Sequence, residues 1–507
     1  MKNRRLTINM IASILSFAIN IGISFFLARF IVEKLGREAY GFIGLINNLI
    51  SYASIVTIAL NSLAGRFITL KIHQNDNESA NIYFNSVFLG NVIMSFIIGI
   101  ACIVMLINLN LLINIPYNLD VDVKVAFALV SIEFCTNLIF SVFGTATFVT
   151  DKLYLTSLRT IEANILKVII IFFLFWAYLP KIFYVNISNI SMSLFCILMN
   201  IYYTKKLLPQ IKINLKYFDV KIIFELIKSG AWNIFTRISQ ILETGVDLLL
   251  TNMFLGPSSM GTLSITKTLP NAFVSFTGAI INVFAPQLTI NYAKNEKENM
   301  LLVLRNSFRI MIAFTSIFFA FIVAYSEDFY KLWMPSQDAK TLYILTILSV
   351  FHMPITSGLN SLYNVFTVTN KLKKISIVLL AANTINFIII IISCSFLPKE
   401  ISILMVAGTS SLFSLLVMIF FAIPYSAKCL NLKKTIFLSD LIFCIIVNFV
   451  ITLIFLFVKL FIDINSWIIL FVVVMISGIL GLMINIFFVI PREQRGMLFD
   501  KFVRRNK

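Results

Sequence analysis

Several ionisable residues fall inside long apolar stretches of this sequence, where charge is costly. Arg29, Arg237, Glu243, Asp247 and Lys267 lie within such stretches or near their ends. An ionisable group at mid-membrane costs roughly 2.5–3.5 kcal/mol on the insertion scale, so it faces a cavity or an oppositely charged partner. We expect the three cations to bind an anionic head group and one of the two carboxylates to carry a coupling ion, a proton or sodium. The alternative is structural pairing of Arg237 with Glu243 or Asp247.

Uncharged polar residues accompany these charges at helical spacing, so that each group follows one helix face. Four such stripes are Asn9, Ser13, Ser16, Asn20 and Ser24; Asn47, Ser51, Ser54 and Asn61; Arg237, Gln240, Thr244 and Asp247; and Ser264, Lys267, Asn271, Ser275 and Asn282. We expect Asn20, Asn47, Gln240 and Asn271 to contact a substrate in a water-filled cavity. The alternative is that the stripes bond packed helices to one another and line no cavity.

Motifs of catalysis and of metal binding are absent from the sequence. There is no Walker A loop, no zinc-ligand cluster and no G-x-S-x-G elbow. The six cysteines form no C-x-x-C pair and mostly lie in apolar runs, where they act as small hydrophobic residues. The sequence therefore predicts neither an enzyme nor a protein with a bound cofactor.

The elements that carry these residues are predicted to be transmembrane helices. Of the 507 residues 59% are apolar and 13% are charged, and apolar runs of 18 or more residues are typical of membrane spans. We predict an all-α integral membrane protein with about 14 transmembrane helices. The spans are 8–32, 42–65, 84–107, 123–148, 160–180, 183–204, 229–254, 259–284, 306–325, 341–366, 375–397, 400–423, 435–460 and 466–490.

The distribution of Lys and Arg sets the orientation of these spans. With the N-terminus inside, 28 of the 41 basic residues fall in cytoplasmic loops and 8 in outer loops, as the positive-inside rule requires. We therefore place both termini in the cytoplasm and attribute the net charge of +18 to this rule, not to nucleic-acid binding. The longest loop, about 205–228, is basic and mildly amphipathic. It could lie along the inner leaflet or be a plain solvated linker.

Two motifs recur at an offset of about 220 residues. Leu35-Gly36 and Gly41 return as Leu255-Gly256 and Gly261, and the turn 149–153 (VTDKL) returns as 368–372 (VTNKL). The predicted spans repeat at the same offset, which predicts two parallel six-helix repeats around a central cavity, suited to alternating access, plus two extra C-terminal helices. The predicted domains are a first bundle at 1–210, a basic linker at 211–228, a second bundle at 229–425, and the two extra helices with a basic tail at 426–507.

The basic N-terminus, the first span and Leu35-Gly36-x-x-x-Tyr40-Gly41 before a polar second span resemble one branch of a known superfamily. This is the polysaccharide transporter branch of the multidrug/oligosaccharidyl-lipid/polysaccharide (MOP) flippase superfamily. The repeated turn and the plan of six, six and two helices fit that pattern. The second copy departs from it, because Pro257 follows Gly256 and Met260 replaces the aromatic residue.

The resemblance implies a Wzx-like flippase of a bacterial inner membrane. Its implied substrate is an oligosaccharide repeat unit on undecaprenyl diphosphate, moved to the outer leaflet for O-antigen, capsule or exopolysaccharide synthesis. Implied partners are membrane lipids and the polymerase and chain-length regulator of the same pathway. We expect a monomer, because the two halves already supply the cleft. Alternatives are a multidrug exporter of the same superfamily, a polymerase or glycosyltransferase of the same pathway, and a non-transporting scaffold for such enzymes.

Overall fold

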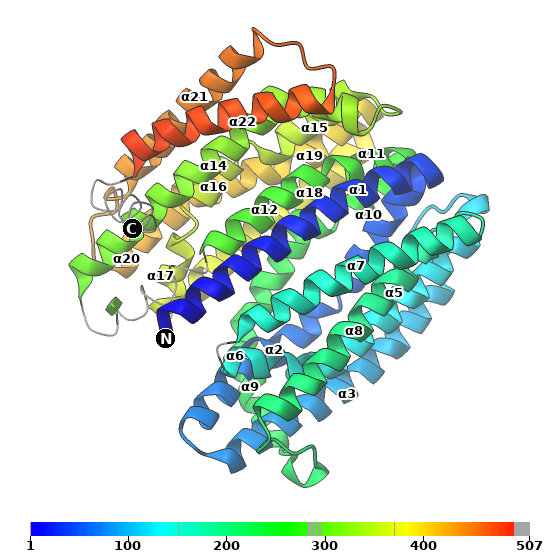
Figure 1. Cartoon of the computed structure of the whole chain (residues 1–507), viewed down its shortest axis with the longest axis vertical. Helices are drawn as coiled ribbons and strands as arrows, with labels where there is room; N and C mark the ends of the chain where they lie inside the picture. Colours follow the sequence, from blue (N-terminus) through cyan, green and yellow to red (C-terminus); the bar gives the residue numbers. More distant parts are fainter. Residues whose placement is uncertain are drawn as a thin grey trace, which may run out of the picture. The chain divides into compact units, whose positions relative to one another are not determined.

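The computed structural model describes residues 2–150, 152–281, 296–369 and 371–490, together with residues 284, 288, 291 and 292. Every regular element in these residues is helical (Figure 1). Among the described helices, nine are long and apolar enough to cross a membrane. The chain is therefore a multi-pass membrane protein, whereas the number of fourteen spans stays a prediction.

Some predicted features lie outside the described residues. They are Asn282, the side chains of Asn9 and Ser13, Asp151 and Asn370 of the repeated turn, and the basic tail at 491–507. The described chain forms two compact units, Met1–Ile265 and Thr266–Lys507. The predicted domain boundaries are not tested by this division and stay predictions.

The first unit is built from long helices joined by short turns. Its elements are α1 (Lys2–Ser51), α2 (Ser54–His73), α3 (Asn77–Ile107), α4 (Leu109–Leu112), η1 (Tyr117–Leu119), α5 (Asp120–Phe140), η2 (Ser141–Gly144), α6 (Thr145–Val149), α7 (Leu153–Ala177), α8 (Phe183–Leu207), η3 (Leu215–Tyr217), α9 (Val220–Gln240), η4 (Ile241–Gly245), α10 (Asp247–Leu250), η5 (Thr251–Leu255) and the start of α11 (Pro257–Thr266). Helices α3, α5, α8 and α7 pack in that order as neighbours (Figure 1). Helix α9 packs on α2 and α3, so a helix predicted to open the second repeat belongs to the first unit.

The second unit contains the following helices: α12 (Thr268–Ile281), α14 (Lys297–Trp333), α15 (Ala339–Val350), α16 (Met353–Gly358), α17 (Leu362–Val368), α18 (Leu372–Phe396), α19 (Lys399–Val417), η6 (Met418–Ala422), α20 (Ile423–Cys429), α21 (Leu438–Lys459), α22 (Trp467–Ile484) and η7 (Asn485–Val489). Its core gathers around α14, whose Phe308 and Tyr325 are fully buried. The predicted extra helices correspond to α21 and α22, and both pack on α14 (Figure 1).

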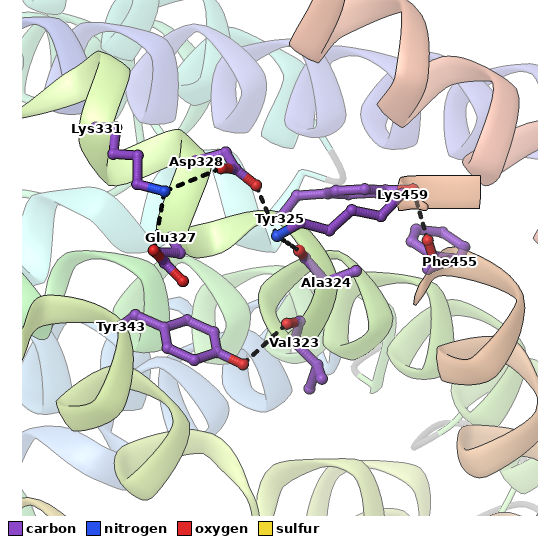
Figure 2. A network of polar contacts seen from close by, with 9 residues as sticks. All are labelled: Val323, Ala324, Tyr325, Glu327, Asp328, Lys331, Tyr343, Phe455 and Lys459. Atoms are coloured by element: carbon purple, nitrogen blue, oxygen red, sulfur yellow. Dashed lines mark hydrogen bonds and ion pairs between the residues drawn. The ribbon is translucent and has the colours of Figure 1, made fainter. Parts of the chain in front are cut away.

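Charged pairs join α14 to α21 near both ends. At one end Lys459 Nζ lies 2.7 Å from Asp328 Oδ2 and donates to the carbonyl of Ala324 (Figure 2). At the other end Arg305 Nε lies 3.5 Å from Asp440 Oδ2. The guanidinium of Arg309, one turn further along α14, lies over the ring of Phe443. Helix α21 is thus held to α14 by electrostatic contacts as well as by apolar packing.

The repeated glycine motif has the same backbone geometry in both copies. Gly36 has φ 85° and ψ 166°, and Gly256 has φ 92° and ψ 171°. This region of φ/ψ space is essentially restricted to glycine. The two copies also meet, because a Cβ on Gly41 would lie 2.9 Å from Gly261 Cα, and Arg37 Nη2 donates to Ser258 Oγ at 2.6 Å. Two copies related by a twofold axis contact each other through equivalent residues near that axis. The contact between the corresponding motifs therefore supports the predicted repeat.

The repeated turn also keeps its hydrogen bonds. The hydroxyls of Thr150 and Thr369 each donate to the carbonyl four residues earlier. The amides of Lys152 and Lys371 each donate to the carbonyl five residues earlier, at 2.8 and 2.9 Å. Each lysine then precedes a helix, α7 or α18, with closely matched φ and ψ. Two motifs identified from sequence alone are therefore also duplicated in conformation.

Candidate substrate-binding face

Arg237 lies in the last turn of α9, within the most polar predicted span. Its Nε donates to Ser54 Oγ at 2.7 Å, and its Nη1 lies 3.4 Å from Gln240 Oε1. Ser54 begins α2, so the guanidinium joins two of the polar stripes within the first unit. Both acceptors are neutral, and a guanidinium has five N–H donors in a planar fork. These bonds use two of the five N–H donors, and neither acceptor offsets the positive charge that Arg237 could offer to an anionic ligand.

The helix that carries Arg237 has an irregular backbone after Gln240. Two π-helical turns, η4 and η5, lie on either side of the short helix α10, which begins with the buried Asp247. Tyr52 Oη donates to the carbonyl of Gly245 at 2.9 Å, and so bonds the turn between α1 and α2 to η4. Single π turns within α-helices often occur at functional sites. Neither Tyr52 nor the π turns were predicted from the sequence, although Tyr52 directly follows Ser51 of the second polar stripe.

The predicted polar residues of α1 form an exposed face. Asn20, Ser24 and Asn47 are all exposed in the described structure. Ser24 Oγ donates to Asn20 Oδ1 at 3.4 Å, and Asn47 bonds only its own helix, at the carbonyl of Ile43. A polar face that bonds within its own helix keeps amide groups accessible, and the substrate contacts of Asn20 and Asn47 stay predictions.

Arg29 has a partner on its own helix. Its Nε lies 2.7 Å from Glu33 Oε1, one turn further along α1. Both side chains are more than a third exposed, and exposed pairs of this kind contribute little to stability. The pair lowers the net positive charge that Arg29 presents, so Arg29 is a weaker candidate than Arg237 for binding an anion.

Asn61, the last residue of the second stripe, bonds a neighbouring helix, as the alternative of helix–helix packing predicts. Its amide group and that of Asn91 on α3 donate to each other at 2.9 Å, and Asn91 also donates to Ser141 Oγ at 3.0 Å. Such reciprocal amide pairs hold helices together. The second stripe is therefore divided, with Ser54 bonded to Arg237 and Asn61 used for packing.

The remaining predicted site residues stay predictions. Lys267 occupies the break between α11 and α12, and Asn271 is exposed one turn further on. Discontinuous helices form the substrate and ion sites of many transporters. Glu243 lies in η4 and Asp247 at the start of α10. No described contact assigns the coupling ion to either carboxylate.

A second polar cluster inside the first unit involves Glu133, which the sequence left without a role. Ser193 Oγ donates to Glu133 Oε1 at 2.6 Å, and the amide of Asn137 lies 3.3 Å from the same hydroxyl. Lys167 lies near enough for its charge to interact with Glu133. These residues come from α5, α7 and α8, so only the packing of three helices could reveal the cluster.

Comparison with known proteins identifies the fold of the chain. No family model matches the chain. It is 26% identical over 385 residues to an uncharacterized membrane protein, EpsK, of Bacillus subtilis (strain 168), with 76% of each chain covered. A lipid II flippase, MurJ, in an inward closed conformation is similar in structure, with a TM-score of 0.67, 16% identity and coverage of 98% of this chain and 99% of that one.

Multidrug transporters are also similar in structure. An inward-facing MATE family transporter of the MOP superfamily matches with a TM-score of 0.61 and 14% identity, covering 84% of this chain and 98% of that one. The chain has the fold of MOP superfamily transporters. At these identities the likeness concerns the fold alone, and the branch within the superfamily belongs to the proposal that follows.

Proposed function

We propose that this protein is a flippase for lipid-linked oligosaccharides. It moves repeat units on undecaprenyl diphosphate from the cytoplasmic to the outer leaflet of a bacterial inner membrane. The product feeds O-antigen, capsule or exopolysaccharide synthesis. The proposal rests on the surroundings of Arg237, which lies on an irregular, polar helix. Its half-buried guanidinium donates to neutral acceptors. The full-length likeness to a fold that includes a lipid II flippase supports it.

The chemistry of the substrate matches the candidate face. A diphosphate needs cationic partners, for which Arg237 and Lys267 are proposed, and bidentate guanidinium contacts suit phosphate. The sugars need amide and hydroxyl partners, for which Asn20, Asn47, Gln240 and Asn271 are proposed. The lipid tail stays in the bilayer. These groups are proposed to line one cavity that opens alternately to the two sides of the membrane.

The remaining features of the proposal follow from the sequence. The chain would cross the membrane 14 times as two parallel six-helix repeats and two extra helices, with both termini in the cytoplasm. Asp247 or Glu243 would carry the coupling ion, a proton or sodium. The protein would work as a monomer without a resident cofactor, together with the polymerase and chain-length regulator of its pathway.

Complementation tests the proposal. The chain is expressed in a strain that lacks the flippase of a known O-antigen pathway, and surface polymer is measured against lipid-linked repeat units retained inside. We expect polymer to return, and Arg237→Gln to lower it by roughly tenfold or more, because a charge-assisted contact to the diphosphate is lost. Arg237→Lys should keep part of the activity, and Lys399→Gln, which alters an exposed lysine at the start of α19, should keep all of it.

Two results would contradict the proposal. One is full surface polymer from Arg237→Gln at equal membrane abundance, which would remove the cationic contact from the mechanism. The other is failure of the wild-type chain in several hosts together with a gain of drug resistance. That combination would favour the multidrug exporters that share this fold.

A further inference from the structure

A hollow of about 260 Å³ lies in the second unit, on the side predicted to face the cytoplasm. Its lining comes from three places: Lys371 before α18, Cys429 to Leu432 at and after the end of α20, and five residues before and within the start of α14, which are Asn291, Tyr292, Lys297, Met300 and Leu301. The space is smaller than the roughly 300–1,000 Å³ of sites for drug-sized ligands. It could hold a head group but not a whole oligosaccharide.

The donors around this hollow are those that an anion needs. Lys297 and Lys371 contribute two ammonium groups, and Asn291, Asn431 and Tyr292 contribute amide and hydroxyl groups. Lys371 Nζ donates to the carbonyl of Cys429 at 3.3 Å, which directs the ammonium toward the segment after α20. An ammonium has three donors, so this bond does not exhaust the group.

The surroundings of the hollow are strongly basic. Exposed lysines at 373, 374, 428, 433 and 434 lie on two of the three lining segments, against two exposed acids at 296 and 298. The carboxylate of Glu296 accepts a bond from Asn299 Nδ2 at 2.9 Å. It makes no capping bond to the first turn of α14. The amide groups of that turn are therefore not occupied by the preceding side chain, and a helix start favours negative charge.

Phosphate meets these requirements better than other biological anions. It carries up to two charges and three acceptor oxygens, and it binds ammonium groups as point charges. We propose that this pocket binds a phosphate or diphosphate group through Lys297 and Lys371. The site lies at the leaflet where anionic head groups face the cytoplasm. It does not depend on which substrate the protein transports, so it goes beyond the proposed function.

Binding is measured on the purified full chain in detergent by titration calorimetry with inorganic diphosphate. We expect Lys297→Gln/Lys371→Gln to weaken binding by roughly tenfold or more. The matched control is Lys433→Gln/Lys434→Gln, which removes the same charge from exposed neighbours that do not line the pocket. It should weaken binding by about threefold or less, because exposed charges act only through a screened field.

A second variant tests the proposal independently, in case Lys297→Gln/Lys371→Gln does not fold. Asn431→Asp adds a negative charge to the lining at a residue in the left-handed region, φ 59°, where Asp is tolerated. It should also weaken diphosphate binding by roughly tenfold. Equal weakening by the two double variants, no binding to the wild type, or equally tight binding of succinate would each overturn the proposal.

A competition experiment identifies the source of the phosphate group. The protein is placed in nanodiscs of phosphatidylcholine with or without phosphatidic acid, and the diphosphate titration is repeated. If phosphatidic acid weakens diphosphate binding through Lys297 and Lys371, the pocket takes a lipid head group. If it has no effect while binding in the phosphatidylcholine discs persists, the pocket takes a soluble phosphate compound.

Discussion

Helices α3 and α14 occupy corresponding positions in the two predicted repeats, but their first turns have different neighbours. They begin at Asn77 and Lys297, an offset of 220 residues. The residue before each helix is acidic. Asp76 caps α3 by accepting from the amide of Ser79 at 3.1 Å, whereas Glu296 makes no such capping bond. Hydrogen bonds from Ser79 and the neighbouring Lys71 ammonium hold the pKa of Asp76 below its ordinary value.

The second difference concerns the chain that follows the sixth helix of each repeat. After α8, residues 210–214 are bound along α3. Asn81 donates to the carbonyl of Gln210 and accepts from the amide of Lys212. Asn85 in turn donates to the carbonyl of Lys212 and accepts from the amide of Asn214. Two asparagines one turn apart thus pair with the linker as a neighbouring strand would. The linker is therefore not a plain solvated segment at these residues.

In the second unit the same positions carry Leu301 and Arg305. Leucine has no group that can bond a passing backbone, and Leu301 lines the hollow described above. Arg305 contacts Asp440 of α21 instead. The two helix faces therefore differ at these aligned positions: the asparagines of α3 bind the linker, whereas Leu301 of α14 lines a pocket and Arg305 contacts α21.

The largest expected effect comes from breaking the linker contact in the first unit. In Asn81→Leu/Asn85→Leu, the four bonds to the backbone of the linker are lost, and each contributes about 0.5–1.5 kcal/mol net. We expect a loss of about 2–4 kcal/mol in the free energy of unfolding and faster trypsin cleavage after Lys212 and Lys216. Asn108→Leu is the matched control, because its amide bonds only the carbonyl of Val104 on its own helix. Equal effects of the two variants would refute the role of the linker contact.

The next largest effect is expected at the other end of the contact between α14 and α21, where Lys459 pairs with Asp328. Lys459→Met leaves Asp328, whose side chain is 12% exposed, without its nearest cation (Figure 2). Breaking a buried pair costs about 3–5 kcal/mol, and the partial exposure of Lys459 and the second cation Lys331 reduce this to about 2 kcal/mol. Adding Asp328→Asn should recover about half of the loss, since no buried charge then remains.

Lys331→Met is the control for this pair. Lys331 contacts Glu327 at 2.9 Å and Asp328 at 3.5 Å, but its side chain is 55% exposed. Exposed ion pairs contribute about 0–1 kcal/mol, so thermal unfolding of this variant should stay close to that of the wild type. A loss as large as that of Lys459→Met would mean that the network as a whole, and not the Asp328–Lys459 pair, holds α21.

Much of the architecture could be predicted because the membrane imposes a simple rule on sequence. A span needs about 20 apolar residues, and the nine apolar spans of the described chain were all found this way. The predicted spans that the length and hydropathy criteria do not recover are 8–32, 42–65, 229–254, 259–284 and 341–366. Four of them are broken within the helix, at Tyr52–Ala53, at Val246, at Lys267 and at Phe351–His352. Such breaks depend on tertiary contacts that a hydropathy pattern does not contain.

The candidate site was predicted in its residue types but not in its contacts. Helical spacing placed Ser54 and Arg237 on polar faces, but only packing of α2 against α9 shows that they bond. Glu133 and Ser193 are 60 residues apart, and no local pattern relates them. The linker contact was missed for the same reason. Asn81 and Asn85 lie before the predicted span 84–107 or at its edge, so they drew no attention as intramembrane polar residues.

The smallest expected effect tests whether the two repeats share their glycine turns. Gly36→Ala and Gly256→Ala each force a Cβ into backbone conformations that are nearly identical, with no atom within 4 Å to add a clash. The cost is then conformational, about 1–2 kcal/mol each, and should agree between the two variants within experimental error. Gly99→Ala, in the interior of α3 and equally uncrowded, should instead stabilise the protein by about 0.5–1 kcal/mol, because alanine is the better helix former. Unfolding midpoints of the three variants decide the question. If the two turn variants differed by more than the Gly99→Ala change, the likeness of the turns would be geometric only, and other contacts in each copy would set their stability.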